Sequence, residues 1–385
     1  MIYLDYAASN PMDPRVHEAL VEVLAWTGNP SSVHAFGRKL RIALDDARSA
    51  VAKLIDVPAN DVFFTSGATE GNNTVLLGYF RRLRELYGSD RELRLLVSAI
   101  EHSSVRVNLG RLEAELGVII DKLPVDGDGV VDIKRVGNLL RDSTAMVCVM
   151  WANNIIGSLQ PIAEIGRLIS AIRQERGSNG LPLVFMSDAV QALRTESVKP
   201  REFGVDILTL SGHKIYGPRG VGAVYIRSDL ELAPLIIGGE QEAGWRAGTE
   251  NVAGIVGLGQ AATNLLAERS VDRAKVVDLT QRLRTGLREQ SELVVIGDTA
   301  RSVPGILYVA STKLSGEILT LKLDAAGIAV SSGSACDAGT RKSASVLQEI
   351  CSSQIARHGG LRLSLGRFNT QKEVQSVLQI LSTLV

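Results

Sequence analysis

The chain contains 385 residues, of which 45% are hydrophobic, so it can bury a large core and should form one large and one smaller domain. Lysine plus arginine and aspartate plus glutamate each number 42, a balance that argues against direct nucleic-acid binding as the main task. The first residues lack a signal-peptide pattern, and no stretch reaches the roughly 18 uncharged apolar residues of a membrane span. We therefore expect a cytoplasmic protein without a membrane partner.

Short apolar runs alternate with helical patterns over the first two thirds of the chain. Amphipathic spacing predicts helices over 38–54 and 161–173. The arginine-rich stretch 81–94 is interpreted as a solvated helix face. The runs that predict strands are 61–65, 95–98, 145–150, 183–186, 207–210 and 221–226. Buried strands separated by helices indicate an α/β fold with a mostly parallel sheet covered on both faces.

The pattern changes after residue 260. A charged helix over 271–290, strands over 293–296 and 305–309, and a last helix over 370–384 predict a smaller α+β domain. The predicted large domain spans 15–259, and the predicted small domain comprises 1–14 and 260–385.

Polar clusters follow five of the apolar segments. They are 66–70, 101–102, 153–154, 188–191 and 211–214. Ligands of open α/β sheets bind at the carboxyl ends of the strands, so these clusters predict one common binding site.

Lys214 stands at the end of a buried strand, within a turn bounded by glycines. It is either a surface turn residue or a Schiff-base former, and the second role needs desolvation or a cationic neighbour such as His213.

Asp188 is either a helix cap or the partner of a buried cation, and the segment 66–73 is either an ordinary helix start or an anion site. His102 is either a core histidine or a residue that stacks on a ring and moves protons. Taken together, an imine-forming lysine, a carboxylate for a protonated ring nitrogen and a phosphate site describe pyridoxal 5'-phosphate.

With these motifs, the chain resembles the class V aminotransferase-like enzymes that use pyridoxal 5'-phosphate. Among them it is most similar in its motifs to the cysteine desulfurases of the nitrogenase and iron-sulfur-cluster type. The matching segments occur in family order across nearly the whole chain: 3–8, 28–32, 64–70, 101–102, 153–157, 188–191, 211–218, 246–249, 331–336 and 362–368. The resemblance implies a large cofactor-binding domain built on a mostly parallel, seven-stranded mixed sheet between helices, beside a smaller α+β domain.

The resemblance also implies roles around the cofactor ring. Lys214 would form the Schiff base, Asp188 would pair with the ring nitrogen, and His102 would stack on the ring. Gln191 would bind the phenolate oxygen, and Asn154 would lie among the cofactor-binding residues.

Phosphate and substrate roles follow from the same resemblance. The residues expected to hold the phosphate are Ala68, Thr69, Ser211 and His213, with Thr249 contributing across a homodimer interface. Asn154 and Arg362 would bind the substrate carboxylate, a task suited to the planar fork of an arginine. The small domain would thereby close over the substrate.

The three cysteines, Cys148, Cys336 and Cys351, show no spacing typical of a disulfide framework or a metal site. Cys148 lies in a predicted strand and Cys351 on an apparent helix, so both are interpreted as small buried hydrophobes. Cys336 lies in a small, polar segment, about 331–345, whose composition suits a mobile catalytic loop.

Cys336 separates desulfuration from the other reactions of this cofactor. The amine of L-cysteine would displace Lys214, Lys214 and His102 would move protons, and the Cys336 thiolate would attack the substrate sulfur. The products would be alanine and a persulfide on Cys336, which passes its sulfur to an acceptor protein. Two alternatives stay open: a lyase or aminotransferase in which Cys336 has no catalytic role, and a catalytically silent sulfur-carrier or scaffold subunit.

Three departures from the family pattern affect details. Ile155 stands where many members have glutamate, Ser9 and Asn10 replace the usual pair of threonines, and the segment 173–182 is longer than usual. The chain stops at Val385 without the tail of the housekeeping members. This difference places DNA phosphorothioation beside iron-sulfur cluster assembly as an expected pathway.

Overall fold

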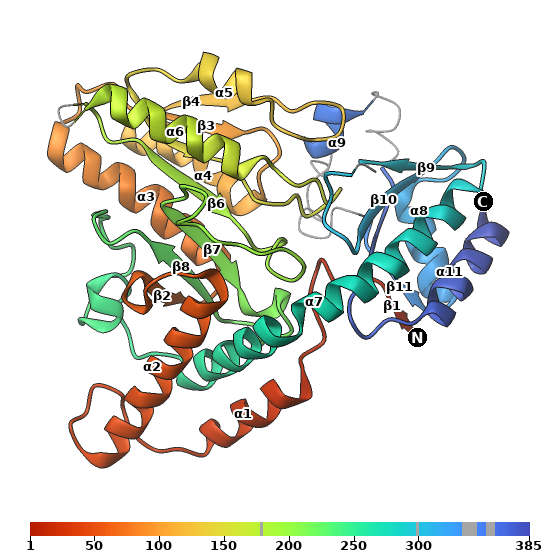
Figure 1. The fold of residues 1–385 in the computed structure, drawn as a ribbon, viewed down its shortest axis with the longest axis horizontal. Helices are drawn as coiled ribbons and strands as arrows, with labels where there is room; N and C mark the ends of the chain where they lie inside the picture. The colour runs from red at the N-terminus through yellow and green to blue at the C-terminus, as the bar shows by residue number, and fades with distance from the viewer. Residues whose placement is uncertain (178–179, 298–299, 333–344, 352–358) are drawn as a thin grey trace.

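The computed structural model describes residues 1–177, 180–297, 300–332, 345–351 and 359–385 (Figure 1). Within these residues a seven-stranded sheet has the order β2-β8-β7-β6-β5-β3-β4. Its strands are β2 (Val62–Thr65), β3 (Arg94–Ser98), β4 (Ile119–Leu123), β5 (Thr144–Cys148), β6 (Val184–Asp188), β7 (Ile207–Ser211) and β8 (Gly222–Ile226). Only β8 runs antiparallel to its neighbours, so the prediction of a mixed, mostly parallel α/β sheet is confirmed.

Both faces of this sheet are buried at its centre, where β5, β6, β7 and β8 are buried at every position, whereas the edge strand β4 is partly exposed. Alternate side chains of one strand enter different cores: Phe185 of β6 packs in one, and Val184 and Met186 pack in the other. Helices α2 (Ala35–Ile55), α5 (Ile133–Leu139) and α6 (Ile162–Arg176) cover the first face. Helices α3 (Ala68–Tyr87) and α4 (Ser103–Leu116) cover the second face.

A second, antiparallel sheet has the order β12-β10-β9 and lies to one side of the large sheet (Figure 1). Its strands are β9 (Leu293–Ile296), β10 (Ile306–Ser311) and β12 (Leu361–Ser364). Helices α8 (Gly316–Ala325) and α11 (Gln371–Leu384) pack on it in a separate core. The amino terminus joins this region, because β1 (Ile2–Tyr3) pairs in parallel with β11 (Ile328–Ala329).

The long helix α7 (Val252–Arg288) connects the two regions, and α1 (Pro14–Leu24) lies beside it (Figure 1). The prediction that this helix begins at residue 271 was wrong, since it begins 19 residues earlier and runs through the proposed domain boundary at 259–260. Its first turns carry glycines because neighbouring backbones approach closely: a Cβ at Gly259 would lie 2.6 Å from the Cα of Ala47. Small residues weaken the apolar periodicity that reveals a helix in a sequence. The division into domains stays a prediction.

The arginine-rich stretch 81–94 forms ion pairs within the chain. Arg82 pairs with Glu85 and Glu231, and Arg94 pairs with Glu92 and Asp121, so these arginines of the 81–94 stretch face carboxylates of the same chain. In the described part of the chain, no helix combines the length and the apolar character needed to cross a membrane.

Candidate active site

One cavity of about 520 Å³ collects the predicted site residues at the carboxyl ends of the large sheet. Those that line it are Ala68, Thr69, His102, Asn154, Asp188, Gln191, Ser211, His213, Lys214 and Arg362. They come from the ends of β2, β3, β6 and β7, from the segment after β5, and from β12 of the smaller sheet. Thr249 is exposed and is not among the lining residues, and Cys336 lies outside the described residues.

Lys214 ends a short 3₁₀ turn, Gly212–Lys214, that directly follows β7. Its ammonium group donates hydrogen bonds to the backbone carbonyls of Ala7 and of Ala8, the second at 2.8 Å. Burial, together with the charges of Lys214 and Arg219, lowers the pKa of His213 to about 4. His213 is therefore neutral at pH 7, and the idea that it serves Lys214 as a cationic neighbour was wrong.

Asp188 ends β6 and is only 4% exposed. Its Oδ1 accepts from the Val190 N–H at 3.0 Å, and its Oδ2 accepts from the side-chain amide of Asn72 at 2.9 Å. Thr209 donates to Asn72 Oδ1 at 2.8 Å, which fixes the amide so that its NH₂ group faces the carboxylate. The two donors hold the Asp188 carboxylate in one orientation at the floor of the cavity.

His102 caps α4 and belongs to the same network. Its Nδ1 accepts from the Ser104 N–H at 3.2 Å and lies 2.8 Å from Ser104 Oγ, which itself accepts from Asn72 at 2.8 Å. Because a backbone N–H can only donate, Nδ1 acts as the acceptor and carries no proton. The remaining proton of His102 therefore lies on Nε2.

The amino terminus of α3 forms an anion cradle. Its first residue is Ala68, and the preceding Gly67 has φ 154° and provides no side-chain cap. A Cβ at Gly67 would lie 3.9 Å from Ser211 Oγ in a backbone conformation that L-residues avoid. Helix N–H groups, the hydroxyls of Thr69 and Ser211, and His213 thus converge where a phosphate can be bound.

Arg362 reaches the cavity from β12 and is 4% exposed. Its Nη1 donates to the Asn154 carbonyl at 2.9 Å, and its Nη2 pairs with Asp5 at 2.8 Å. Its Nε is buried and has no hydrogen-bond partner within the described residues. A buried guanidinium with an unused donor is suited to receive a small carboxylate.

Gln191 and Glu101 complete the wall. Gln191 donates to the Ala7 carbonyl at 2.9 Å. Glu101 receives hydrogen bonds on Oε1 from Ser98 at 2.5 Å and from the Met150 N–H at 2.6 Å, whereas its Oε2 is buried without a partner among the described atoms. Burial raises the pKa of Glu101 to about 8, so its carboxyl is mostly protonated at pH 7.

The sequence reasoning assigned no role to several residues of this site. They are Asp5, Asn72, Glu101, Ser104, Arg106 and Arg219. Asn72 lies in the segment 66–73 and Glu101 lies next to His102, so their place in the predicted polar clusters was an available signal. Asp5 acts through a partner more than three hundred residues away, and no local pattern indicates such a contact.

The residues present fit pyridoxal 5'-phosphate. An oriented carboxylate, an uncapped helix terminus with two hydroxyls, and a lysine at the end of a buried strand line the same cavity. The unused Arg362 Nε provides a separate place for a substrate carboxylate. The arrangement can therefore hold a phosphorylated pyridine aldehyde beside an amino acid.

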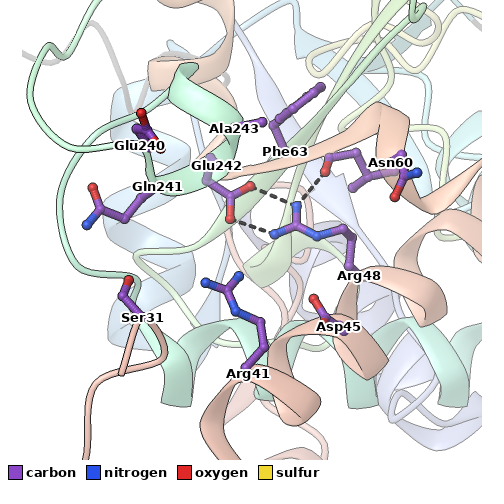
Figure 2. A pocket seen from close by; sticks show the side chains of 11 residues that line it. Ser31, Arg41, Asp45, Arg48, Asn60, Phe63, Glu240, Gln241, Glu242 and Ala243 are labelled. Carbon is purple, nitrogen blue, oxygen red and sulfur yellow. Dashed lines mark hydrogen bonds and ion pairs between the residues drawn. The ribbon is translucent and has the colours of Figure 1, made fainter. Parts of the chain in front are cut away.

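A second cavity, of about 650 Å³, lies between α2, β2 and the segment 240–243 (Figure 2). Arg48 points into the centre of this group and donates to Glu242 at 2.7 and 2.8 Å and to the Val62 carbonyl at 2.5 Å. Glu242 also accepts from the Phe64 N–H at 2.7 Å. These bonds hold Glu242 at φ 48°, so its ion pair with Arg48 fixes the start of the loop that leads to Thr249.

Comparisons with known proteins agree with this geometry. The model of the class-V aminotransferase family matches residues 2–377. Cysteine desulfurase IscS 1 of Archaeoglobus fulgidus is 37% identical over 386 residues, which cover 100% of this chain and 97% of the relative. Cysteine desulfurase IscS of Dictyoglomus turgidum is 36% identical, with 100% and 94% of the two chains covered.

Solved structures that are similar to this chain share its fold over nearly its whole length. A structure described as a NifS-like protein superposes with a TM-score of 0.90 and 31% identity, covering 100% of this chain and 98% of the other. The structure of SspA in complex with cysteine gives a TM-score of 0.80 and 28% identity over 96% of this chain and 100% of that one.

Proposed function

Because the chain belongs to the class-V aminotransferase family, and within it to the cysteine desulfurases, we propose that it converts L-cysteine to L-alanine. The sulfur would be collected as a persulfide on Cys336. The observation that carries the proposal is the convergence of Lys214, Asp188, His102 and Arg362 on one cavity.

Pyridoxal 5'-phosphate, when bound, supplies an electron sink that stabilises negative charge next to the amino-acid nitrogen. The α3 terminus, Ser211 and His213 would hold its phosphate, and the oriented Asp188 carboxylate would face its ring nitrogen. Lys214 would attach to its aldehyde, which requires the lysine side chain to leave the carbonyls of Ala7 and Ala8.

The substrate would be fixed by its carboxylate. The buried Arg362 retains Nε for this purpose, and Asp5 and the Asn154 carbonyl hold its other two nitrogens in place. Once the substrate amine has replaced it, Lys214 is a free base that can accept a proton from the substrate. Lys214 can return the proton that it has accepted, and His102, with its hydrogen on Nε2, can donate a hydrogen bond to the substrate at the same cavity wall.

Cys336 would then take the sulfur. Its thiolate attacks the substrate sulfur, so that a sulfur–sulfur bond forms and the carbon–sulfur bond breaks, with the electron pair remaining on the carbon. Protonation of that carbon gives alanine. No external oxidant is needed, because the substrate carbon is reduced as the transferred sulfur is oxidised.

The proposal includes two partners, a second copy of this chain and a protein that accepts the sulfur. Thr249 is exposed on its own chain and does not line the cavity, which supports a role toward the site of a second copy in a homodimer. A protein that accepts the persulfide sulfur, in DNA phosphorothioation or in iron-sulfur cluster assembly, completes the reaction, and a cytoplasmic location is expected for it.

A test of the cofactor part uses Lys214→Ala. The wild-type protein supplied with pyridoxal 5'-phosphate should develop the visible absorbance of a lysine Schiff base and release alanine from L-cysteine, and the variant should do neither. A wild-type protein without this absorbance, unchanged by Lys214→Ala, would support the silent sulfur-carrier alternative instead.

A further inference from the structure

The amino-terminal segment 7–10 contacts Lys214 at the side-chain ammonium group and at the backbone carbonyl. The carbonyls of Ala7 and Ala8 accept from the ammonium group. At the other end, the Asn10 side chain donates to the backbone carbonyl of Lys214. The Asn10 N–H also donates to the adjacent His213 carbonyl at 2.8 Å. Two consecutive carbonyls of the lysine turn are thus held by one residue.

Chemistry determines which end of the Asn10 amide faces Lys214. Arg194, which is 5% exposed, donates to Asn10 Oδ1 at 3.3 Å. A guanidinium cannot accept a hydrogen bond and a backbone carbonyl cannot donate one, so Oδ1 must face Arg194 and Nδ2 must face Lys214. Asn10 itself is 4% exposed, and either bond, once lost, would leave a buried polar group without its partner.

The turn that Asn10 holds is under conformational constraint. Tyr216, two residues after Lys214, has φ 63°, which is unfavourable for a residue of its size. The Asp13 N–H donates to its carbonyl at 3.0 Å, and its hydroxyl accepts from the Arg367 N–H at 3.1 Å. The amino-terminal segment therefore fixes this turn at both His213–Lys214 and Tyr216.

We propose that Asn10 is a positioning residue for Lys214: its amide ties the lysine backbone to Arg194 and so sets where the lysine nitrogen lies in the cavity. This inference rests on the proposed function, in which Lys214 must reach the cofactor aldehyde. The two ends of the Asn10 amide act at separate atoms, Oδ1 toward Arg194 and Nδ2 toward Lys214, so one side chain spans both partners.

Two variants separate the two bonds of Asn10. Asn10→Ala removes both, whereas Asn10→Asp keeps an acceptor for Arg194 and removes the donor to Lys214. Pyridoxal 5'-phosphate is added to the cofactor-free protein, and the rate of Schiff-base formation is followed by visible absorbance, with borohydride trapping to locate the adduct on Lys214. Both variants lack the bond from Asn10 to the Lys214 carbonyl, and the loss of that one buried hydrogen bond implies an adduct rate roughly threefold to tenfold slower than that of the wild type.

Asn369 provides the matched control. It is also a buried asparagine, and its side chain donates to the Tyr3 carbonyl at 3.1 Å and accepts from the Gly366 N–H at 2.9 Å. Its side chain also lies 3.4 Å from a Glu373 oxygen, so Asn369→Asp should lower thermal stability at least as much as Asn10→Asp does and leave the adduct rate unchanged. In turnover, kcat divided by the number of sites that carry the Lys214 adduct should fall in Asn10→Asp and stay at the wild-type value in Asn369→Asp, a difference that a mere loss of folded protein does not produce.

The outcomes distinguish this inference from the proposed function. Wild-type rates in both Asn10 variants overturn the positioning role alone, and so does an equal slowing by Asn369→Asp. If Asn10→Ala does not fold, Asn10→Asp decides, because it retains the partner of Arg194. A wild-type protein that forms no adduct on Lys214 rejects the proposed function and this inference with it.

Discussion

The side-chain amide of Asn72 lies 2.9 Å from Oδ2 of Asp188, at the floor of the cavity, and is itself completely buried. Asn72 also donates to Ser104, which contacts His102. One residue of α3 thus holds both the carboxylate expected to pair with the cofactor's ring nitrogen and the serine that contacts the histidine expected to stack on the ring.

Asn72→Ala should therefore weaken cofactor binding about tenfold, because a hydrogen bond to a charged group contributes roughly 1.5–3 kcal/mol and a water can restore part of it. The measurement is a titration of cofactor-free protein with pyridoxal 5'-phosphate. The neighbouring Asn73 is half-buried and its side chain bonds within its own helix, so Asn73→Ala should bind as the wild type does. Equal affinities for all three proteins would contradict the role of Asn72.

Glu101 makes the stability of the cofactor-free protein dependent on pH. Burial raises its folded pKa from 4.5 to about 8, against the hydrogen bonds from Ser98 and Met150. The folded state then binds more protons than the unfolded state between these values, and stability falls as pH rises through that window, by at most about 1.4 kcal/mol per pH unit. Glu101→Gln cannot ionise, so its melting temperature relative to wild type should increase from pH 5 to pH 8. A constant difference across this range would show that Glu101 titrates normally.

His213 gives the opposite dependence in the cofactor-free protein. Burial lowers its folded pKa from 6.5 to about 4, so the unfolded state binds more protons between these values. The contribution of the neutral ring to stability is present above pH 6.5 and is lost as pH falls toward 4. His213→Gln should reduce the loss of melting temperature between pH 6.5 and 4.5. An identical acid profile in wild type and variant would place the His213 pKa near its ordinary value.

Arg362→Lys should impair binding of L-cysteine more than turnover of the bound substrate. Lysine retains the charge but cannot serve Asp5, the Asn154 carbonyl and a carboxylate in one plane. We expect KM to rise roughly 10- to 100-fold, the equivalent of one charged hydrogen bond, with a smaller change in kcat. The control is Arg282→Lys, which alters an exposed pair with Asp278. An unchanged KM in Arg362→Lys would move the substrate carboxylate elsewhere.

The sequence predicted the sheet well where burial leaves a continuous apolar run, as in β6 and β7. It failed where tertiary contacts decide. The strand expected over 145–150 ends at Cys148, and just beyond it the Met150 N–H bonds to the Glu101 side chain. The edge strand β4 contains Asp121 and Lys122 and was not predicted, since an exposed strand needs no apolar run.

In the candidate site, too, local sequence pattern predicted some residues, whereas features that depend on tertiary contacts were not predicted. Residues next to a strand end, such as Asp188 and Lys214, could be found from local pattern and from the family resemblance. The charge state of His213 could not, because it depends on burial and on Arg219 across the turn. The bridge from Arg194 through Asn10 to Lys214 joins segments far apart in the chain, and a single sequence carries no signal for it.

The central claim is that Cys336 accepts the sulfur of L-cysteine, and the most direct measurement compares wild type with Cys336→Ser, both loaded with pyridoxal 5'-phosphate. After incubation with L-cysteine, mass spectrometry of the peptide containing Cys336 should show one added sulfur atom in the wild type, and alanine should form in equal amount before any acceptor or reductant is added. Cys336→Ser should bind the cofactor and L-cysteine normally and form almost no alanine. Alanine production at the wild-type rate by Cys336→Ser, or added sulfur on Cys148 or Cys351 in place of Cys336, would contradict the account.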